Sequence, residues 1–214
     1  GSVKHEYANS QSGRGVVVKG NFTLYNGGIT TNNCSTNYPP ERLYSGAGVY
    51  VDGGGSFTMY GGKVAENIAM NGAGVYVNKD GSAAMYGGKI TGNKVGEGYG
   101  AGVYVGGGTF DMYGGSISGN NQLGWNYNGD GGGVYINSGS FNLHDGTITG
   151  NNGYWGGGVN LYNGAFNMEG GKISNNTAGR NGTGGGVYVY NGTFTMTGGE
   201  ISGNRSNGSG AGVI

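Results

Sequence analysis

Four side chains are of the types that carry acid–base chemistry and fall at related positions in the sequence: Asp111, His144, Asp145 and Glu169. His144 and Glu169 occupy the same position in consecutive repeats, so we expect them to be neighbours in space. Hydrolysis of a glycosidic bond needs two converging carboxyl groups, and a calcium-dependent lyase needs clustered carboxylates with a basic side chain. The other acids are scattered over different positions of the repeat. We therefore predict a solvated surface pair, with no enzyme activity, catalytic residue, metal site or cofactor.

A second set of side chains could bind a ligand instead of transforming one. Aromatic rings stack on the apolar faces of sugars, while nearby amides and carboxylates take hydrogen bonds from sugar hydroxyls. The candidate ligand-binding residues are aromatic or acidic and lie in insertions between repeats: Tyr99, Trp125, Tyr127, Asp130, Tyr154 and Trp155. The expected partners are glycans or host surface molecules. The alternative is that these aromatic side chains only pack over a corner of the fold.

Charge and cysteine content argue against several other functions. The chain has 11 basic and 11 acidic side chains and no Lys/Arg cluster to grip a phosphate backbone, so we expect no nucleic-acid partner. It lacks an apolar run of roughly 18 residues, so we expect no direct membrane insertion. Cys34 is the only cysteine, which excludes an internal disulfide and a cysteine-based metal site. We interpret Cys34 as a loop thiol, with an intermolecular link as the alternative.

All these residues are carried on one motif that the chain repeats, and three apolar columns index its copies. The columns are Val16, Val49, Val75, Val103, Val134, Val159, Val187; then Phe22, Phe57, Ala83, Phe110, Phe141, Phe166, Phe194; then Ile29, Val64, Ile90, Ile117, Ile148, Ile173, Ile201. The step from the second to the third column is seven residues in every copy, whereas the step to the next copy varies from 11 to 20. One side of each copy is therefore fixed, and the other carries insertions that we expect along one edge.

The repeat predicts the fold. A period of 25 to 33 residues indicates a solenoid in which each copy stacks on its neighbours. Apolar and polar residues alternate within a copy, as in Phe194 to Thr197, which indicates short strands. We expect a further inward row beside the phenylalanine column, made of Met59, Met85, Met112, Leu143, Met168 and Met196. Gly-Gly pairs follow the strands, where the chain must turn with positive φ. We predict an all-β, single-stranded, right-handed parallel β-helix of about seven rungs with three short strands each.

Three further columns, in which one polar or aromatic residue type recurs in most copies, accompany the apolar columns. One aromatic column is Tyr50, Tyr76, Tyr104, Tyr135 and Tyr188, interrupted by Asn160; another is Tyr25, Tyr60, Tyr86 and Tyr113, followed by His144, Glu169 and Thr197. We expect both to form outward aromatic ladders, with sugar stacking as the alternative use of their rings. The third column is Asn32, Asn67, Asn93, Asn120, Asn151, Asn176 and Asn204. We expect these residues to adopt left-handed backbone at a bend and their amides to form a hydrogen-bonded ladder.

The Gly-Gly-Gly-Val and Phe-x-x-x-Gly-Gly-x-Ile-x-x-Asn motifs resemble the right-handed β-helix repeats of bacterial surface proteins, including adhesins, autotransporters and polymorphic outer-membrane proteins. More distantly they are similar to the pectate-lyase-like superfamily. The resemblance spans Gly15 to Ile214 and implies a parallel β-helix. It does not select one function, because that fold carries lyases, hydrolases, adhesins and passive stalks.

We expect residues 1–14 to be a lead-in that begins with a cloning remnant and is disordered or laid across the first rung. Residues 15–214 are expected to form one β-helix solenoid domain, a fragment of a longer protein that could associate end to end. The resemblance implies a non-catalytic structural or adhesive segment of a bacterial cell-surface or secreted protein, with variable loops on a rigid rod. The alternative is a carbohydrate-binding or polysaccharide-active β-helix, which a groove with converging carboxylates would favour.

Overall fold

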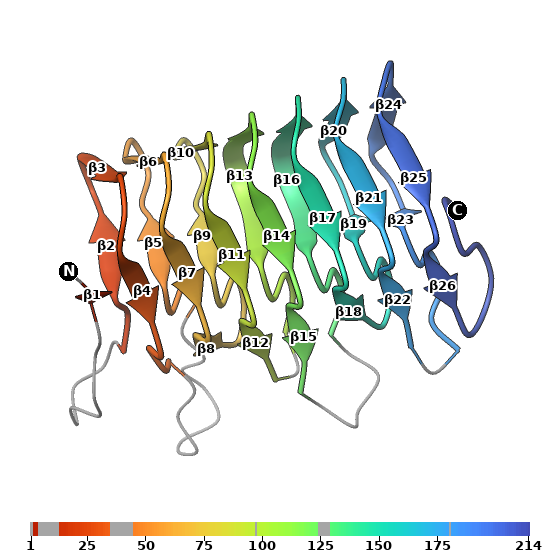
Figure 1. The fold of residues 1–214 in the computed structure, drawn as a ribbon, viewed down its shortest axis with the longest axis horizontal. Coiled ribbons are helices and arrows are strands. Elements are labelled where there is room, and N and C mark those ends of the chain that lie inside the picture. Colours follow the sequence, from red (N-terminus) through yellow and green to blue (C-terminus); the bar gives the residue numbers. More distant parts are fainter. Residues whose placement is uncertain (1, 4–12, 35–44, 97, 124–128, 180) are drawn as a thin grey trace.

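The chain is a parallel β-solenoid (Figure 1). A computed structural model describes residues 2–3, 13–34, 45–96, 98–123, 129–179 and 181–214. These residues form strands and turns without a helix, and each strand pairs in parallel with the corresponding strand of the next copy. The predicted all-β parallel architecture is thereby confirmed.

The first sheet, which we call the isoleucine sheet, contains the third apolar column. It has eight strands: β1 (Ser2–Val3), β4 (Gly28–Thr30), β7 (Lys63–Ala65), β11 (Lys89–Thr91), β14 (Ser116–Ser118), β17 (Thr147–Thr149), β21 (Lys172–Ser174) and β25 (Glu200–Ser202). Ile90 pairs with Ile117, and Ile117 with Ile148, so the column is in register. β1 pairs with β4, so part of the predicted lead-in extends the solenoid.

The second sheet, which we call the valine–phenylalanine sheet, has 12 strands and contains the first two columns. The valine half contains β2 (Val16–Val18), β5 (Val49–Val51), β9 (Val75–Val77), β19 (Val159–Leu161) and β23 (Val187–Val189). The phenylalanine half contains β3 (Asn21–Leu24), β6 (Ser56–Met59), β10 (Ser82–Met85), β20 (Ala165–Met168) and β24 (Thr193–Met196). β13 (Val103–Met112) and β16 (Val134–Leu143) run through both halves, where two short strands were expected.

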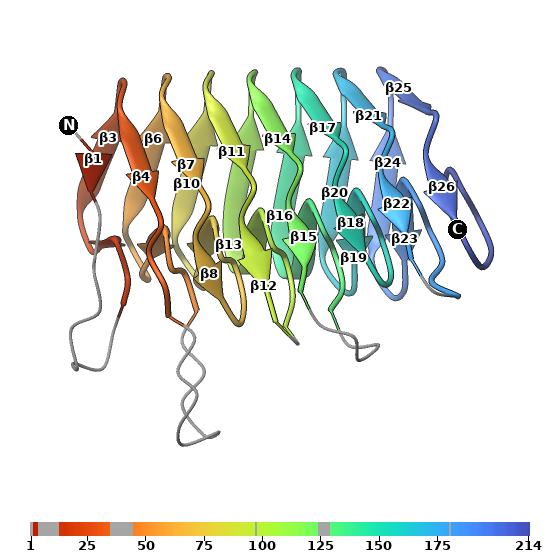
Figure 2. The ribbon, with the colours of Figure 1, turned by 60° about the horizontal axis from the view of Figure 1, so that its bottom comes forward.

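The third sheet, which we call the edge sheet, has six strands of two residues. They are β8 (Ile68–Ala69), β12 (Lys94–Val95), β15 (Asn121–Gln122), β18 (Asn152–Gly153), β22 (Thr177–Ala178) and β26 (Arg205–Ser206). The first copy contributes only an isolated bridge from Asn33 to Ile68 to this sheet, so six copies have strands in all three sheets, against about seven predicted rungs. The connections between copies leave from this sheet, along one side of the solenoid (Figures 1 and 2).

The core is the continuous stack of inward columns. Each column repeats the same apolar residue type at the strand spacing of about 4.8 Å, so burial in one rung is repeated in the next. The row predicted beside the phenylalanines is buried at Met59, Met85, Met112, Leu143 and Met168. Met196, in the last such strand, is 44% exposed. Apart from this residue, the predicted inward row is confirmed.

The phenylalanine column forms an incomplete aromatic stack. Ring centroids are 5.7 Å apart for Phe22 and Phe57 and 5.2 Å apart for Phe110 and Phe141. Ala83 lies in register between Phe57 and Phe110 and is itself buried. The stack is therefore split in two, because alanine offers no ring at that rung.

The asparagine column is a buried ladder, as predicted. The Nδ2 of Asn120 donates to Asn151 Oδ1 on the next rung and to the Ile90 carbonyl on the preceding rung, both at 3.0 Å. The backbone N–H of Asn120 donates to the same Asn151 oxygen. The prediction of left-handed backbone at the ladder Asn itself is wrong. The residue before each ladder Asn adopts the left-handed conformation, with φ of 61° at Gly119. The ladder Asn can then turn its amide into the stack.

Cys34 lies outside the strands, directly after the bridge at Asn33, but its thiol is buried. Its backbone N–H donates to the Ile68 carbonyl. Its side chain is buried in a small apolar cluster beside the edge sheet, formed with Ala47, Ala69, Ala73, Val95 and Ala101. Burial raises the pKa of the thiol to about 11, which outweighs the opposing field of Arg14. Because the reactive form is the thiolate, this environment disfavours the alternative of an intermolecular link.

Candidate functional site

The described insertions place predicted binding residues along the edge of the solenoid. Tyr99, Asp130, Tyr154 and Trp155 are described there, and Trp125 and Tyr127 lie outside the described residues. Tyr99 and Tyr154 are half-buried, Trp155 is exposed, and Asp130 is buried. The four residues therefore differ in what they can offer a ligand.

The first aromatic column forms the floor on which these insertions pack. Ring centroids are 5.1 Å apart for Tyr50 and Tyr76, 4.7 Å for Tyr76 and Tyr104, and 5.3 Å for Tyr104 and Tyr135. The rings are nearly parallel, so each ring covers the face of its neighbour. Tyr104 and Tyr135 are buried, although their side chains point away from the core. The ladder faces are thus occupied by other rings and are not free to stack on a sugar.

The insertion aromatics add to this ladder from the side. Tyr99 stacks on Tyr135 with centroids 4.7 Å apart, and Trp155 stacks on Tyr188 at 5.8 Å. Tyr154 contacts Trp155 at a tilt of 45°. These contacts support the alternative that the aromatic residues pack over the corner, yet the Trp155 side chain still leaves 39% of its surface exposed.

Asp130 is a buried carboxyl group enclosed by this aromatic packing. It is 8% exposed, and its Oδ1 accepts a hydrogen bond from the Trp155 backbone N–H at 3.3 Å. Burial raises the pKa of the Asp130 carboxyl to about 6, and the Trp155 hydrogen bond only partly opposes that rise. The carboxyl group therefore lacks the compensation that a buried charge needs.

Asn160 is the functional candidate that sequence reasoning missed. It pairs with Tyr135 and Tyr188 in the first aromatic column, where it replaces a tyrosine. It is 1% exposed, its Nδ2 donates to the Trp155 carbonyl at 3.3 Å, and its Oδ1 is buried without a hydrogen-bond partner among the described residues. The available signal was the single break in the tyrosine column.

Asp130 and Asn160 meet at one residue. The Trp155 backbone N–H donates to Asp130, and the Trp155 carbonyl accepts from Asn160. Asp130, Trp155 and Asn160 thus form a compact polar group, flanked by Tyr135 and Tyr188, which we call the edge site. The site combines under-satisfied acceptor groups with aromatic side walls, a combination suited to a ligand that donates hydrogen bonds.

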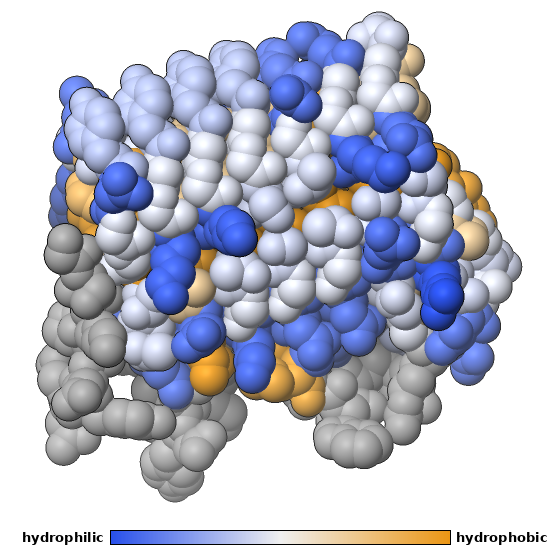
Figure 3. All heavy atoms as spheres, in the orientation of Figure 1, coloured by the Kyte–Doolittle hydropathy of each residue, from blue (hydrophilic) through white to orange (hydrophobic). Residues whose placement is uncertain are grey.

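The second aromatic column also stacks, and it ends in a histidine. Tyr25, Tyr60, Tyr86 and Tyr113 follow one another at 4.8 to 5.3 Å, and Tyr113 stacks on His144 at 4.4 Å. These four tyrosines are exposed at their edges while their faces stack on each other. The face of the molecule seen in Figure 3 is mostly pale or blue, with only small apolar areas.

The structure brings together three of the four residues singled out for acid–base chemistry. His144 Nδ1 is 2.8 Å from Glu169 Oε2, and His144 Nε2 is 3.8 Å from Asp111 Oδ1. Asp111 also accepts a hydrogen bond from Asn142 Nδ2 at 2.6 Å. Asp145 is not part of this contact set; its Oδ1 accepts from the Gly146 backbone N–H. The two carboxylates face different imidazole nitrogens, so they do not converge on one point beside the ring.

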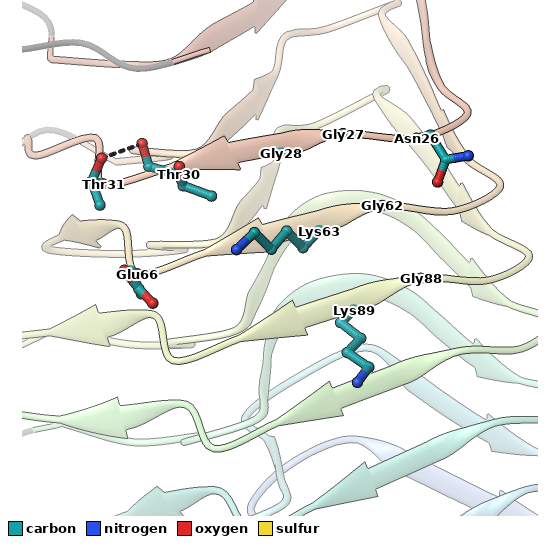
Figure 4. Close-up of a pocket in the computed structure, with 10 residues that line it drawn as sticks. All are labelled: Asn26, Gly27, Gly28, Thr30, Thr31, Gly62, Lys63, Glu66, Gly88 and Lys89. Carbon is teal, nitrogen blue, oxygen red and sulfur yellow. Dashed lines mark hydrogen bonds between the residues drawn. The ribbon is translucent and has the colours of Figure 1, made fainter. Parts of the chain in front are cut away.

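A shallow open hollow lies over the isoleucine sheet and the turns beside it (Figure 4). Lys63 and Lys89 extend from neighbouring strands, and Thr31 and Glu66 lie at the turns that follow β4 and β7. Thr31 and Glu66 hold φ of 60° and 57°, a left-handed backbone that non-glycine residues rarely adopt. The hollow is lined by exposed side chains such as Lys63, Lys89 and Glu66, together with Thr30, which is 7% exposed.

No group of three or more His, Cys, Asp or Glu side chains in the described part of the chain is arranged to hold a metal ion. Across the same residues, no helix has the length and apolar character needed to cross a bilayer.

Comparison with protein-family models, curated proteins and solved structures returns no match to this chain. The parallel β-solenoid is therefore shown by the pairing of its strands. The resemblance to adhesins, autotransporters and pectate-lyase-like proteins remains a prediction from the repeat motifs.

Proposed function

We propose that this chain is a non-catalytic structural and adhesive segment of a bacterial cell-surface or secreted protein, which binds glycans along the edge of a rigid rod. Rigidity follows from the parallel sheets, the buried Asn ladder and the stacked rings, which link every described rung to the next. Side chains that change from rung to rung gather on the edge, where binding residues on a scaffold concentrate.

The observation that carries this proposal is the edge site. Trp155 is exposed beside a buried carboxyl group and a buried amide oxygen that has no hydrogen-bond partner among the described residues. The regular faces, by contrast, repeat similar pairings at successive rungs and offer little that is specific. Glycan recognition suits the edge because sugars combine an apolar ring face with hydroxyl donors.

A glycan array tests the proposal directly. The purified chain is expected to bind a subset of neutral glycans, and Trp155→Ala or Trp125→Ala is expected to weaken that binding. Tyr86→Ala, in the exposed second ladder away from the insertions, is the matched aromatic control and should bind like the wild type. Absence of binding across the array, or full retention of binding in both tryptophan variants, would overturn the adhesive role of this edge.

The second candidate is a polysaccharide-active β-helix, and the contact of His144 with Asp111 and Glu169 favours it. The cluster is solvent-exposed on a sheet face, where a paired histidine is more often structural than catalytic. Incubation with pectins, alginates and glucans, followed for unsaturated or reducing ends, separates the two candidates. We expect no turnover; turnover that His144→Ala or Glu169→Gln abolishes would replace the first proposal.

A further inference from the structure

The edge site contains a buried hydrogen-bond acceptor to which no described residue donates. In the first aromatic column, Tyr135 and Tyr188 pair with Asn160 from the two neighbouring rungs. Tyrosine side chains of this column stack on each other, but an amide between two rings cannot repeat that contact. Asn160 Oδ1 has no hydrogen-bond partner among the described residues, and a buried acceptor left unpaired destabilises the folded chain.

A second acceptor contacts the same residue. The Trp155 backbone N–H donates to the Asp130 carboxyl group, and the Trp155 carbonyl accepts from Asn160 Nδ2, with both hydrogen bonds at 3.3 Å. No positively charged partner of Asp130 appears among the ion pairs of the described residues. Two acceptor side chains grouped around one residue match a ligand with several donors, such as the hydroxyl groups of a sugar ring.

The burial of the site favours a neutral donor over a cation. An ammonium or guanidinium group would have to lose its hydration to reach a carboxyl group that is 8% exposed, and that desolvation offsets much of the attraction. The pKa of Asp130 is already raised to about 6 by burial, which shows that the surroundings resist charge. A hydroxyl group supplies a hydrogen bond without bringing a second charge into the site.

We propose that Asp130 and Asn160 accept hydrogen bonds from hydroxyl groups of a neutral sugar residue, and that the sugar ring packs against the Trp155 indole. The inference rests on the proposed glycan-binding function and names its subsite and ligand class. Asp130 was anticipated as a binding residue from the sequence, whereas Asn160 was expected only to interrupt a ladder.

Because Asn160 is 1% exposed, a sugar reaches its Oδ1 only after neighbouring side chains move. Trp155 is the exposed side chain of the edge site, and its movement would disturb its ring contacts with Tyr154 and Tyr188. A sugar hydroxyl that pairs with Asn160 Oδ1, and a sugar ring that packs on the indole, offset the loss of those contacts.

Asn160→Leu is the decisive variant, because leucine fills similar space without an acceptor. Binding of methyl glycosides of glucose, galactose, mannose and N-acetylglucosamine is followed by tryptophan fluorescence and calorimetry, together with the best oligosaccharide from the array. We expect Asn160→Leu and Asp130→Asn each to weaken binding about tenfold, the loss of one such hydrogen bond. Tyr86→Ala serves as the control, and its affinity should equal that of the wild type.

The outcomes separate the two proposals. If the wild type binds glycans but Asn160→Leu and Asp130→Asn bind equally well, the subsite is overturned while the adhesive function stands. If no glycan binds at all, both proposals fall. Binding of choline or arginine, lost in Asp130→Asn and without any sugar binding, would overturn the ligand class. Thermal unfolding of Asn160→Leu provides the folding check, and a melting temperature at or above that of the wild type is expected.

Discussion

Two buried asparagines in different columns of the same solenoid have opposite surroundings. Asn120 lies in a column of asparagines, and its amide donates to Asn151 on one side and to the Ile90 carbonyl on the other. Asn160 lies in a column of tyrosines; its amide makes one long contact with the Trp155 carbonyl, and its oxygen has no partner among the described residues. Both side chains are almost fully buried.

The difference shows how a parallel solenoid satisfies buried polar groups. Because neighbouring rungs are in register, a side chain that can both donate and accept is satisfied when the same residue recurs above and below it. A single amide between two tyrosines lacks such a neighbour. Repetition therefore stabilises the Asn ladder, and the break in repetition leaves a group that a ligand could use.

The largest expected effect on stability comes from removing the hydrogen bonds of Asn120 in the Asn ladder. Asn120→Asp removes both donors of the amide and faces a buried carboxylate toward the Asn151 and Ile90 oxygens, so we expect a loss of about 3–5 kcal/mol in unfolding free energy. Denaturant unfolding measures this loss. Asn191→Asp, in an exposed pair with Asn163, is the matched control and should change stability by less than about 0.5 kcal/mol. Equal losses in the two variants would contradict the ladder as a stabilising element.

An intermediate effect concerns the carboxyl group of the edge site. Burial raises the pKa of Asp130 in the folded chain to about 6, above the ordinary aspartate value of 3.8, so the folded state binds the proton more tightly. Its contribution to stability is present below pH 4 and is lost as the pH rises to about 6, by at most about 3 kcal/mol. Unfolding measured from pH 4 to 7 in wild type and in Asp130→Asn isolates this contribution. An identical pH dependence in the two proteins would show that Asp130 is solvated.

The smallest expected effect on stability comes from replacing Asn160, whose amide oxygen has no partner among the described residues. Asn160→Leu removes the orphan oxygen and one 3.3 Å hydrogen bond, and the Trp155 carbonyl keeps its hydrogen bond from the Gly131 N–H at 2.8 Å. We expect a gain of about 1 kcal/mol in unfolding free energy, because the buried unpaired acceptor is gone. Chemical denaturation of the purified variant measures it. A loss of 2 kcal/mol or more in unfolding free energy would mean that the Asn160 amide is hydrogen-bonded and stabilises the fold, as the Asn120 amide does.

Much of the fold could be predicted from the sequence because the determinants are local and repeated. The constant step of seven residues between the second and third columns sets two strands on every rung, and the alternation around Phe110 or Phe141 selects their inward side. The Asn ladder and both tyrosine ladders follow from identical residues at identical offsets. The left-handed position before each Asn was missed, because several residue types occupy it, including Glu66 and Asn175.

For the insertions, the sequence predicted only where they lie and not which residues they contact. Their lengths differ between copies, so the sequence placed Tyr99, Asp130 and Trp155 on one edge without saying what they contact. The structure adds that Tyr99 packs on Tyr135 and that Asp130 is buried beneath such contacts. Cys34 shows the same limit: the sequence left it in a loop, whereas pairing with Ile68 places it in an apolar cluster.

The sequence by itself determined the parallel stacking, the inward columns and the ladders, because each depends on a period that can be counted along the chain. Only the tertiary structure decided that Asp130 and Asn160 share the backbone of Trp155 and that the Asn160 amide oxygen has no partner among the described residues. The physical reason is that hydrogen-bond satisfaction depends on which atoms meet across rungs and insertions. Residues 30 positions apart meet there, and no period in the sequence specifies their contact.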